Sequence, residues 1–165
     1  MGEKTTSNLK KAFQGESEAY FRNLAYAKVA EKEELPQIAS LFRAMAEAEA
    51  VHSLKMLKLR GIVKNTEANL ERAFSTETYA LDQAYPDLIR EAEEEGEKAA
   101  LMAFSQARDV EEFHAALYQK AISDMMADRE SKYHVCAVCG YITDGEPPDR
   151  CPVCQAPKEK FKFVE

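Results

Sequence analysis

The sequence lacks any apolar run that approaches the length of a membrane-spanning helix, which needs about 20 such residues. It also lacks an excess of positive charge, because 22 Lys and Arg stand against 29 Asp and Glu, for a net charge of -7. Nucleic acid is therefore not an expected partner, since binding to phosphates depends on basic surfaces. Residues 1–11 are polar and show no export signal. We expect a cytoplasmic protein that does not enter a membrane.

Cysteine is scarce, and all of it lies near one end of the chain. The four cysteines form two Cys-x-x-Cys pairs, and no thiol is left over. In a reducing compartment such pairs favour metal thiolates over disulfides. Four thiolates complete a tetrahedral site for zinc or for one iron ion, and the spacing does not decide between these metals. The predicted ligands are Cys136, Cys139, Cys151 and Cys154.

Proline and glycine are rare before residue 131, and apolar residues there recur every three or four positions. This period predicts helices. The predicted segments cover residues 6–33, 36–60, 66–95 and 97–128. Pro86 should kink the third segment, because its ring removes one backbone hydrogen bond and crowds the preceding turn. We therefore predict a mainly α protein, with a four-helix bundle over residues 1–130 and a small four-cysteine domain over residues 131–165.

Acidic and histidine side chains interrupt the apolar stripes of all four segments. The second and fourth segments each carry Glu-x-x-His, and residues three apart on a helix share one face. The first and third segments each carry a single glutamate on the stripe. Corresponding positions lie 61 or 62 residues apart, which suggests a duplicated helical hairpin. The six candidates are Glu16, Glu49, His52, Glu77, Glu111 and His114.

These six side chains stand where Leu or Phe would be expected in a bundle core. One such glutamate would be an ordinary boundary residue, but unpaired carboxylates in a core cost several kcal/mol each. Two divalent cations would neutralise four carboxylates. The pattern is that of ferritin-like di-iron proteins, with one Glu from each of two helices and Glu-x-x-His from the other two. Oxygen and imidazole ligands suit iron or manganese, and affinity alone does not exclude zinc.

The chain resembles a rubrerythrin over nearly all of its 165 residues. The resemblance rests on residues 12–17, both Glu-x-x-His motifs, Glu77, Tyr85-Pro86 and the cysteine pairs. It implies a ferritin-like bundle with two Fe ions, followed by a rubredoxin-like domain with one Fe, or Zn in its place. It implies reduction of hydrogen peroxide to water, with electrons from rubredoxin or an NAD(P)H-dependent reductase. It also implies a homodimer in which the thiolate iron of one subunit lies near the di-iron pair of the other, and some members exchange helices.

The resemblance also assigns roles by position. It implies one iron bound by Glu16, Glu49 and His52, and the other by Glu77, Glu111 and His114. Glu49 and Glu111 would bridge the two ions, and Tyr85 would hydrogen-bond near the site.

One position departs from the family pattern. Many rubrerythrins carry a further glutamate three residues after the third-helix ligand, which exchanges with the second-helix histidine when iron changes oxidation state. Here that position is Ala80, which has no ligand atom. We therefore predict that His52 stays bound in both oxidation states. The alternative function is a ferroxidase or iron-handling protein with structural zinc in the cysteine site.

Overall fold

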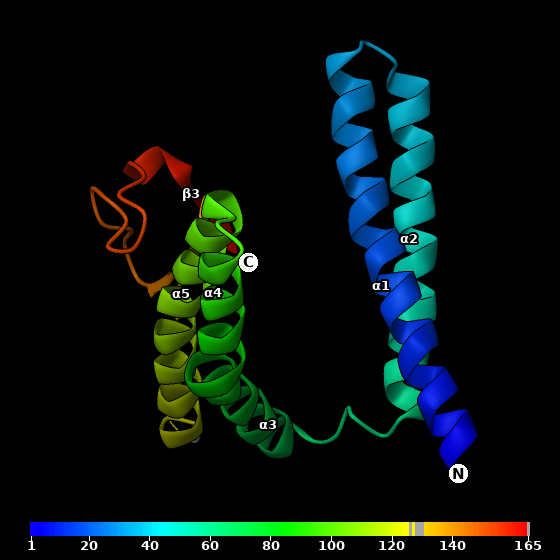
Figure 1. Cartoon of the computed structure of the whole chain (residues 1–165), viewed down its shortest axis with the longest axis horizontal. Coiled ribbons are helices and arrows are strands. Elements are labelled where there is room, and N and C mark those ends of the chain that lie inside the picture. Colours follow the sequence, from blue (N-terminus) through cyan, green and yellow to red (C-terminus); the bar gives the residue numbers. More distant parts are fainter. Residues whose placement is uncertain (126, 128–130, 165) are drawn as a thin grey trace. The chain divides into compact units, whose positions relative to one another are not determined.

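The computed structural model describes residues 1–125, 127 and 131–164. Helices α1 (Glu3–Lys32) and α2 (Pro36–Leu59) run side by side as a hairpin (Figure 1). The residues fully buried between them are small, which lets the two backbones approach closely. These residues are Ala27, Ala30, Ala39 and Ala46. The predicted bounds of both helices are confirmed to within a few residues, and Pro36 occupies the first turn of α2, where a missing N–H costs nothing.

The end of α2 and the start of α3 (Thr66–Tyr79) are both capped by local hydrogen bonds. Gly61 has a positive φ of 65°, which glycine adopts without strain, and the N–H of Ile62 donates to the Leu57 carbonyl. The Asn65 side chain accepts a hydrogen bond of 3.1 Å from the N–H of Ala68. Local hydrogen bonds therefore fix both ends of the connection between α2 and α3.

The interruption predicted at Pro86 takes the form of a wider helical turn. A π-helical segment, η1 (Ala80–Ala84), precedes α4 (Tyr85–Glu94), and the N–H of Tyr85 donates to the carbonyl of Ala80. Pro86 then lies in the first turn of α4, where its missing N–H breaks no helical hydrogen bond. Helix α5 (Lys98–Ser123) ends with Asp124 as its C-terminal cap. The predicted continuation through residue 125 is wrong, and residue 128 lies outside the described residues.

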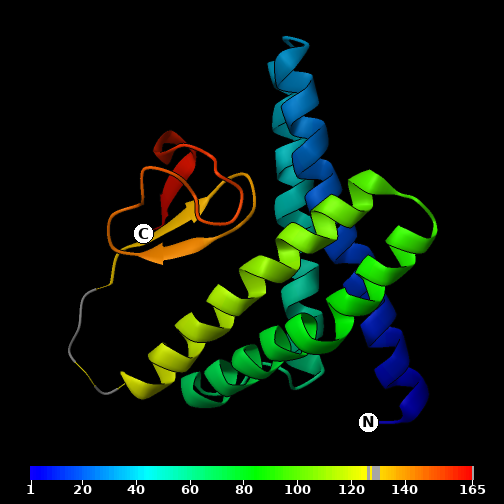
Figure 2. The same ribbon diagram turned by 60° about the vertical axis from the view of Figure 1, so that its left-hand side comes forward.

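Three short strands form the cysteine-containing end of the chain, with the order β2-β1-β3 (Figure 2). Strand β1 (Tyr133–Cys136) pairs antiparallel with β2 (Ile142–Asp144) and with β3 (Phe161–Val164), and the short helix η2 (Lys158–Lys160) precedes β3. The core of this sheet is very small. Its buried members are Cys136, Cys151 and Ala156.

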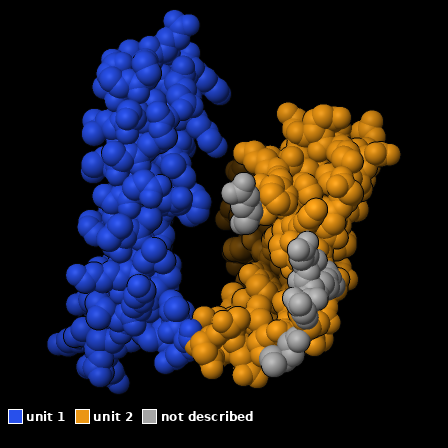
Figure 3. Space-filling model, turned by 180° about the vertical axis from the view of Figure 1, so that it is seen from behind, with its two compact units in different colours: residues 1–64 blue, residues 65–165 orange. Residues whose placement is uncertain are grey.

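The chain divides into two compact units, residues 1–64 and residues 65–165 (Figure 3). The first unit is the α1–α2 hairpin. In the second, α3, η1 and α4 pack against α5, and β2 also contacts α5. The boundary predicted at residue 131 stays a prediction. Within the described part of the chain, no helix combines the length and apolar character needed to cross a membrane.

Candidate metal centres

The first unit brings together three of the predicted ligands. Glu16 lies on α1, and Glu49 and His52 lie one turn apart on α2. Their ligand atoms lie within 4.8 Å of one another. His52 Nδ1 is 3.1 Å from Glu49 Oε2 and 3.7 Å from Glu16 Oε1. The hairpin therefore presents two carboxylates and one imidazole at a single point.

The two carboxyl groups of this cluster shift each other's pKa in opposite directions. The hydrogen bond that the Glu16 carboxyl donates to Glu49, followed by burial and the negative charge of Glu49, raises the pKa of Glu16. The same hydrogen bond lowers the pKa of Glu49. Opposite shifts in two adjacent acids are typical of two like charges held at one site. A bound cation would relieve the repulsion between these two carboxylates.

The second unit brings together the other three predicted ligands. Glu77 lies on α3, Glu111 and His114 lie on α5, and their ligand atoms again lie within 4.8 Å of one another. His114 Nδ1 is 3.0 Å from Glu111 Oε2. This cluster is better enclosed than the first, because the His114 side chain is 20% exposed and that of His52 is 54% exposed. Burial, followed by the hydrogen bond and charge of Glu111, raises the pKa of Glu77 to about 7.

Two tyrosines border the second cluster. Burial, and then the charges of Glu111 and Glu77, raise the pKa of Tyr85, whose hydroxyl also hydrogen-bonds Glu111. Burial and the same two carboxylates raise the pKa of Tyr118. Both phenols therefore stay protonated beside the acids. Tyr118 was not predicted as a site residue, although it stands four residues after His114 on the same stripe, which places it one turn away.

The four thiols converge as the sequence predicted. Cys136 Sγ is 3.7 Å from Cys154 Sγ, Cys139 Sγ is 3.5 Å from Cys151 Sγ, and all four are free thiols. Burial acts against ionisation of Cys136, but hydrogen bonds from the N–H groups of Cys139 and Val138, together with those from the Cys154 and Cys139 thiols, outweigh it and lower the pKa of Cys136. Burial raises the pKa of Cys154. N–H groups aimed at sulfur are the feature that stabilises thiolates bound to a metal.

The two cysteine turns have matching backbone geometry. In the first, the N–H of Gly140 donates to the Cys136 carbonyl, and in the second the N–H of Gln155 donates to the Cys151 carbonyl. Gly140 and Gln155 both have positive φ, at 87° and 61°. Gln155 therefore adopts the left-handed conformation that glycine would hold more easily. The second turn keeps this shape although a residue other than glycine occupies position 155.

The donor sets fit the metals that the sequence pattern predicted. Two carboxylates and one imidazole in each helical cluster offer hard and intermediate donors, which suit iron. Four convergent sulfur atoms fit iron or zinc in a closed tetrahedral site. All three groups meet the distance requirement for holding an ion.

Comparison with known proteins identifies the family. Residues 7–122 match the family model described as Rubrerythrin, and residues 134–162 match the model described as the rubredoxin-like domain of rubrerythrin. The chain belongs to the rubrerythrin family. It contains the ferritin-like rubrerythrin domain and the rubredoxin-like site, and the family is one of oxidoreductases.

Several rubrerythrin relatives match nearly the whole chain. Nigerythrin from Nitratidesulfovibrio vulgaris is 37% identical over 171 residues, which cover 95% of this chain and 85% of the relative. Rubrerythrin-2 from Clostridium acetobutylicum is 32% identical over 96% of this chain and 95% of its own length. A solved structure of nigerythrin in a mixed-valence state matches with a TM-score of 0.60 and 35% identity, over 99% of this chain and 88% of that chain.

The raised pKa of Glu77 predicts how the stability of the metal-free rubrerythrin depends on pH. Between the ordinary carboxyl value of 4.5 and about 7, the folded protein binds more protons than the unfolded chain. Its free energy of unfolding therefore falls as pH rises through this window. We expect a higher melting temperature at pH 5 than at pH 8 in the presence of a chelator. Glu77→Gln should remove part of the difference, and Glu71→Gln, at an exposed position on the same helix, should leave it unchanged.

Proposed function

We propose that this rubrerythrin is a cytoplasmic peroxidase that reduces hydrogen peroxide to water. The observation that supports this most directly is the presence of three metal-binding groups in one chain, two of carboxylate and imidazole and one of four thiolates. Each peroxide molecule takes up two electrons and two protons. A single-electron carrier together with a paired redox site in the same protein suits that stoichiometry. An electron-donor protein, rubredoxin or an NAD(P)H-dependent reductase, would supply the electrons.

We propose iron as the metal in all three groups. The helical ligands are Glu16, Glu49, His52, Glu77, Glu111 and His114, and the thiolate ligands are Cys136, Cys139, Cys151 and Cys154. Iron supplies reversible one-electron chemistry, which zinc does not. The formal charges also favour two cations, because the four carboxylates of the helical groups balance two divalent ions.

The tyrosines next to the second cluster have a role in holding protons. Tyr85 donates a hydrogen bond to Glu111, and its pKa is raised, so its proton remains on the phenol at neutral pH. Burial, and then the charges of Glu77 and Glu111, raise the pKa of Tyr118, so this phenol also stays neutral. Glu77, with a pKa of about 7, exchanges a proton readily near neutral pH when no cation is bound. These groups orient the carboxylates and keep protons close to the metal-binding atoms.

We also propose a homodimer in which the α1–α2 hairpin is exchanged between two copies. A ferritin-like bundle needs one long connection along its length. Helix α2 has 24 residues and so spans about 36 Å. Residues 60–65, which join it to α3, reach roughly 21 Å when fully extended. The connection is too short to return along α2, so a second copy would have to supply the matching hairpin.

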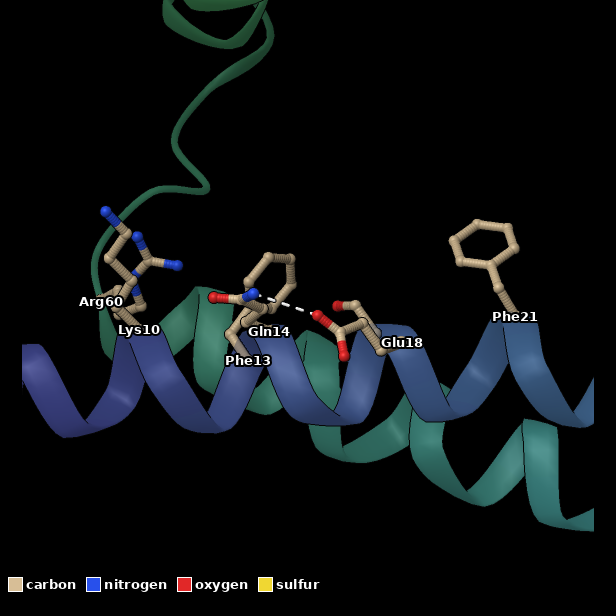
Figure 4. Close-up of a pocket in the computed structure, with 7 residues that line it drawn as sticks. Lys10, Phe13, Gln14, Glu18, Phe21 and Arg60 are labelled. Carbon is tan, nitrogen blue, oxygen red and sulfur yellow. Dashed lines mark hydrogen bonds between the residues drawn. The ribbon is translucent and has the colours of Figure 1, made fainter. Parts of the chain in front are cut away.

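The α1–α2 hairpin exposes large apolar side chains that a second copy would cover in such a dimer. Phe21 is 69% exposed and Val51 is 65% exposed. Phe13 and Phe21 also line an open pocket on α1, beside the Gln14–Glu18 hydrogen bond and Arg60 (Figure 4). Large apolar side chains that lie open on one unit are a common sign of an interface.

The peroxidase proposal is tested by comparing two oxidants. The iron-loaded protein is reduced without oxygen and then mixed with one equivalent of peroxide or of dioxygen, while iron oxidation and peroxide loss are followed by absorbance. We expect faster oxidation by peroxide. Slower oxidation by peroxide than by dioxygen would favour the ferroxidase alternative, which Ala80 supports because the site then lacks a seventh carboxylate. If the protein were colourless and carried zinc on its four thiolates, it would have no internal electron carrier at that site.

Ala80→Glu should restore a movable ligand. Ala80 lies three residues after Glu77, at the start of η1 and on the same face, so a carboxylate there would approach the metal-binding atoms. We predict that His52 and iron change partners with oxidation state in this variant and not in the wild type. Crystal structures of both states measure this directly, and Tyr79→Glu, at an exposed neighbouring position, is the control. Identical iron positions in the oxidised and reduced Ala80→Glu crystals would show that the idea is wrong.

A further inference from the structure

We propose that a pocket beside the second helical cluster admits the apolar group of an organic hydroperoxide, and that this rubrerythrin reduces such hydroperoxides to alcohols. The pocket has a volume of about 480 Å³, and the ligands Glu77 and His114 form part of its lining. Because the reaction would take place at the proposed peroxidase site, the proposal rests on the proposed function. It adds a second class of substrate, which shares the O–O bond of hydrogen peroxide and differs in the group attached to it.

The helical wall of the pocket continues the stripes that carry the metal ligands. Four lining residues of α5 lie at spacings of three, four and seven from the first, so they share one face of the helix. They are His114, Leu117, Tyr118 and Ala121. Leu70 adds to this wall from α3, two turns before Glu77. The helix rises by roughly 10 Å over the seven residues from His114 to Ala121, so the pocket extends from the ligands along an apolar stripe.

The second wall is one face of the small sheet. Val135 is paired with Ile142 across β1 and β2. Tyr133 is paired with Val164 across β1 and β3. Directly paired residues lie on the same face of a sheet, as do residues two apart on one strand. All four side chains therefore belong to one face, and all four line the pocket. Three of them are aliphatic, so this wall is mainly apolar.

Two contacts hold the sheet beside α5 and so keep the walls in place. The rings of Phe113 and Tyr141 meet edge to face, with centroids 4.8 Å apart and an interplanar angle of 86°. Further along the helix, Lys120 Nζ is 3.4 Å from Asp144 Oδ2. An aromatic pair of this geometry contributes beyond its buried area. The pocket is therefore bounded by elements that are fixed to each other at more than one point.

The volume of the pocket exceeds what hydrogen peroxide needs. A water molecule takes up about 30 Å³ in the liquid, and hydrogen peroxide contains one more oxygen atom. At about 480 Å³, the pocket lies within the range of about 300–1,000 Å³ that is usual for small-molecule sites. An apolar lining stabilises an alkyl or aryl group by removing it from water, and it gives little to a small polar molecule. The lining therefore favours a hydroperoxide that also carries an apolar group.

Polar groups lie where the reacting oxygens of such a substrate would be. Glu77 and His114 supply metal-binding atoms, and Tyr118 stands one turn after His114 with a phenol that can donate a hydrogen bond. An apolar group that points toward Ala121 leaves the hydroperoxide oxygens at this end of the pocket. One orientation thus places each part of the substrate against side chains of matching polarity.

Reduction of an organic hydroperoxide needs the same electrons as reduction of hydrogen peroxide. The compound ROOH takes up two electrons and two protons and gives the alcohol ROH and water. The O–O bond breaks, the oxygen bound to carbon takes one proton and leaves as the alcohol, and the other oxygen takes the second proton and leaves as water. The electron-donor protein of the proposed function supplies both electrons, so no other reductant is required.

Binding of the alcohol product tests the pocket without turnover. The full-length protein is loaded with zinc, which is diamagnetic, and methyl ¹H–¹³C spectra are recorded while cumyl alcohol is added. We expect saturable shifts at the methyl groups of Leu117, Val135 and Ile142. We expect none at Val138, which lies in the first cysteine turn and is 55% exposed. Absence of saturable shifts at the pocket methyl groups would overturn the proposal, and this would be the result if the hairpin of a second copy filled the pocket.

Kinetic measurements on the iron-loaded protein compare cumene hydroperoxide with hydrogen peroxide, with reduced rubredoxin as the electron donor. Ala121→Phe places a ring in the pocket two turns from His114. We expect kcat/KM for cumene hydroperoxide to fall by about tenfold or more, because a hydrophobic pocket discriminates strongly against a group that no longer fits. The value for hydrogen peroxide should stay nearly unchanged. Ala116→Phe, at an exposed position on the same helix, should alter neither value.

Val135→Thr provides a second variant that keeps the shape of the side chain and adds a hydroxyl group to the wall. It should lower kcat/KM for cumene hydroperoxide alone. Equal losses for both substrates in Ala121→Phe and in Val135→Thr would overturn the proposal. If the wild type reduces hydrogen peroxide but not cumene hydroperoxide, the proposal fails and the proposed function stands. If the wild type reduces neither compound, both fail.

Discussion

Glu111→Ala should abolish metal binding at the second helical cluster, and Glu112→Ala should leave this binding intact. Glu111 is 15% exposed, accepts from Tyr85, and lies 3.0 Å from His114 Nδ1. Removing it takes away the group that contacts every other member of the second cluster. We expect at least a hundredfold loss of affinity for ferrous iron. The neighbouring Glu112 is exposed, so it provides a control with the same charge change.

The loss should also be visible as a loss of stability. An ion present at one hundred times its dissociation constant stabilises the folded state by about 2.7 kcal/mol. The iron-loaded wild type should therefore melt well above the metal-free protein, and Glu111→Ala should melt at the same temperature with and without iron. Calorimetry and metal analysis of the two variants measure both effects. Equal iron content in Glu111→Ala and Glu112→Ala would refute the assignment of Glu111 as a ligand.

The pairing of a glutamate with a histidine on one helix face could be predicted because a helix repeats every 3.6 residues. Glu49 and His52, and likewise Glu111 and His114, are fixed relative to each other by local geometry alone. The cysteine turns could also be predicted from local sequence, because the two cysteines of each pair belong to one tight turn. The Asn65 cap and the positive φ of Gly61 likewise depend on residues close together in the sequence.

The features that sequence could not predict depend on contacts between distant segments. The hydrogen bond from His114 to Gly140 joins residues 26 positions apart, and no local period relates them. The different enclosure of His52 and His114 likewise depends on what packs over each helix. The sequence predicted a kink at Pro86 but not its π-helical form. A proline indicates that a helix is interrupted, but it does not determine which kind of turn replaces the regular one. The helix end at Ser123 was missed because apolar residues continue beyond it.

Cys151→Ser should unfold the rubredoxin-like domain while the helices remain folded. Cys151 is 0% exposed, and the buried core of the domain consists of this residue with Cys136 and Ala156. A core this small cannot hold three short strands together without a metal. Structural zinc contributes about 10–16 kcal/mol in peptides of similar size, which exceeds the stability of most small domains. Losing one thiolate therefore removes the main source of stability in residues 133–164.

The expected result is the collapse of dispersed ¹H–¹⁵N signals from residues 133–164, with the helical signals retained. Signals of Phe113 and Lys120 on α5 should also shift, because both side chains lose their partners in the domain. Val138→Ser is the matched control, since Val138 lies inside the first cysteine pair and is 55% exposed. That variant should keep its metal and its dispersed spectrum. A dispersed spectrum from metal-free Cys151→Ser would mean that side-chain packing, and not the metal, holds this domain together.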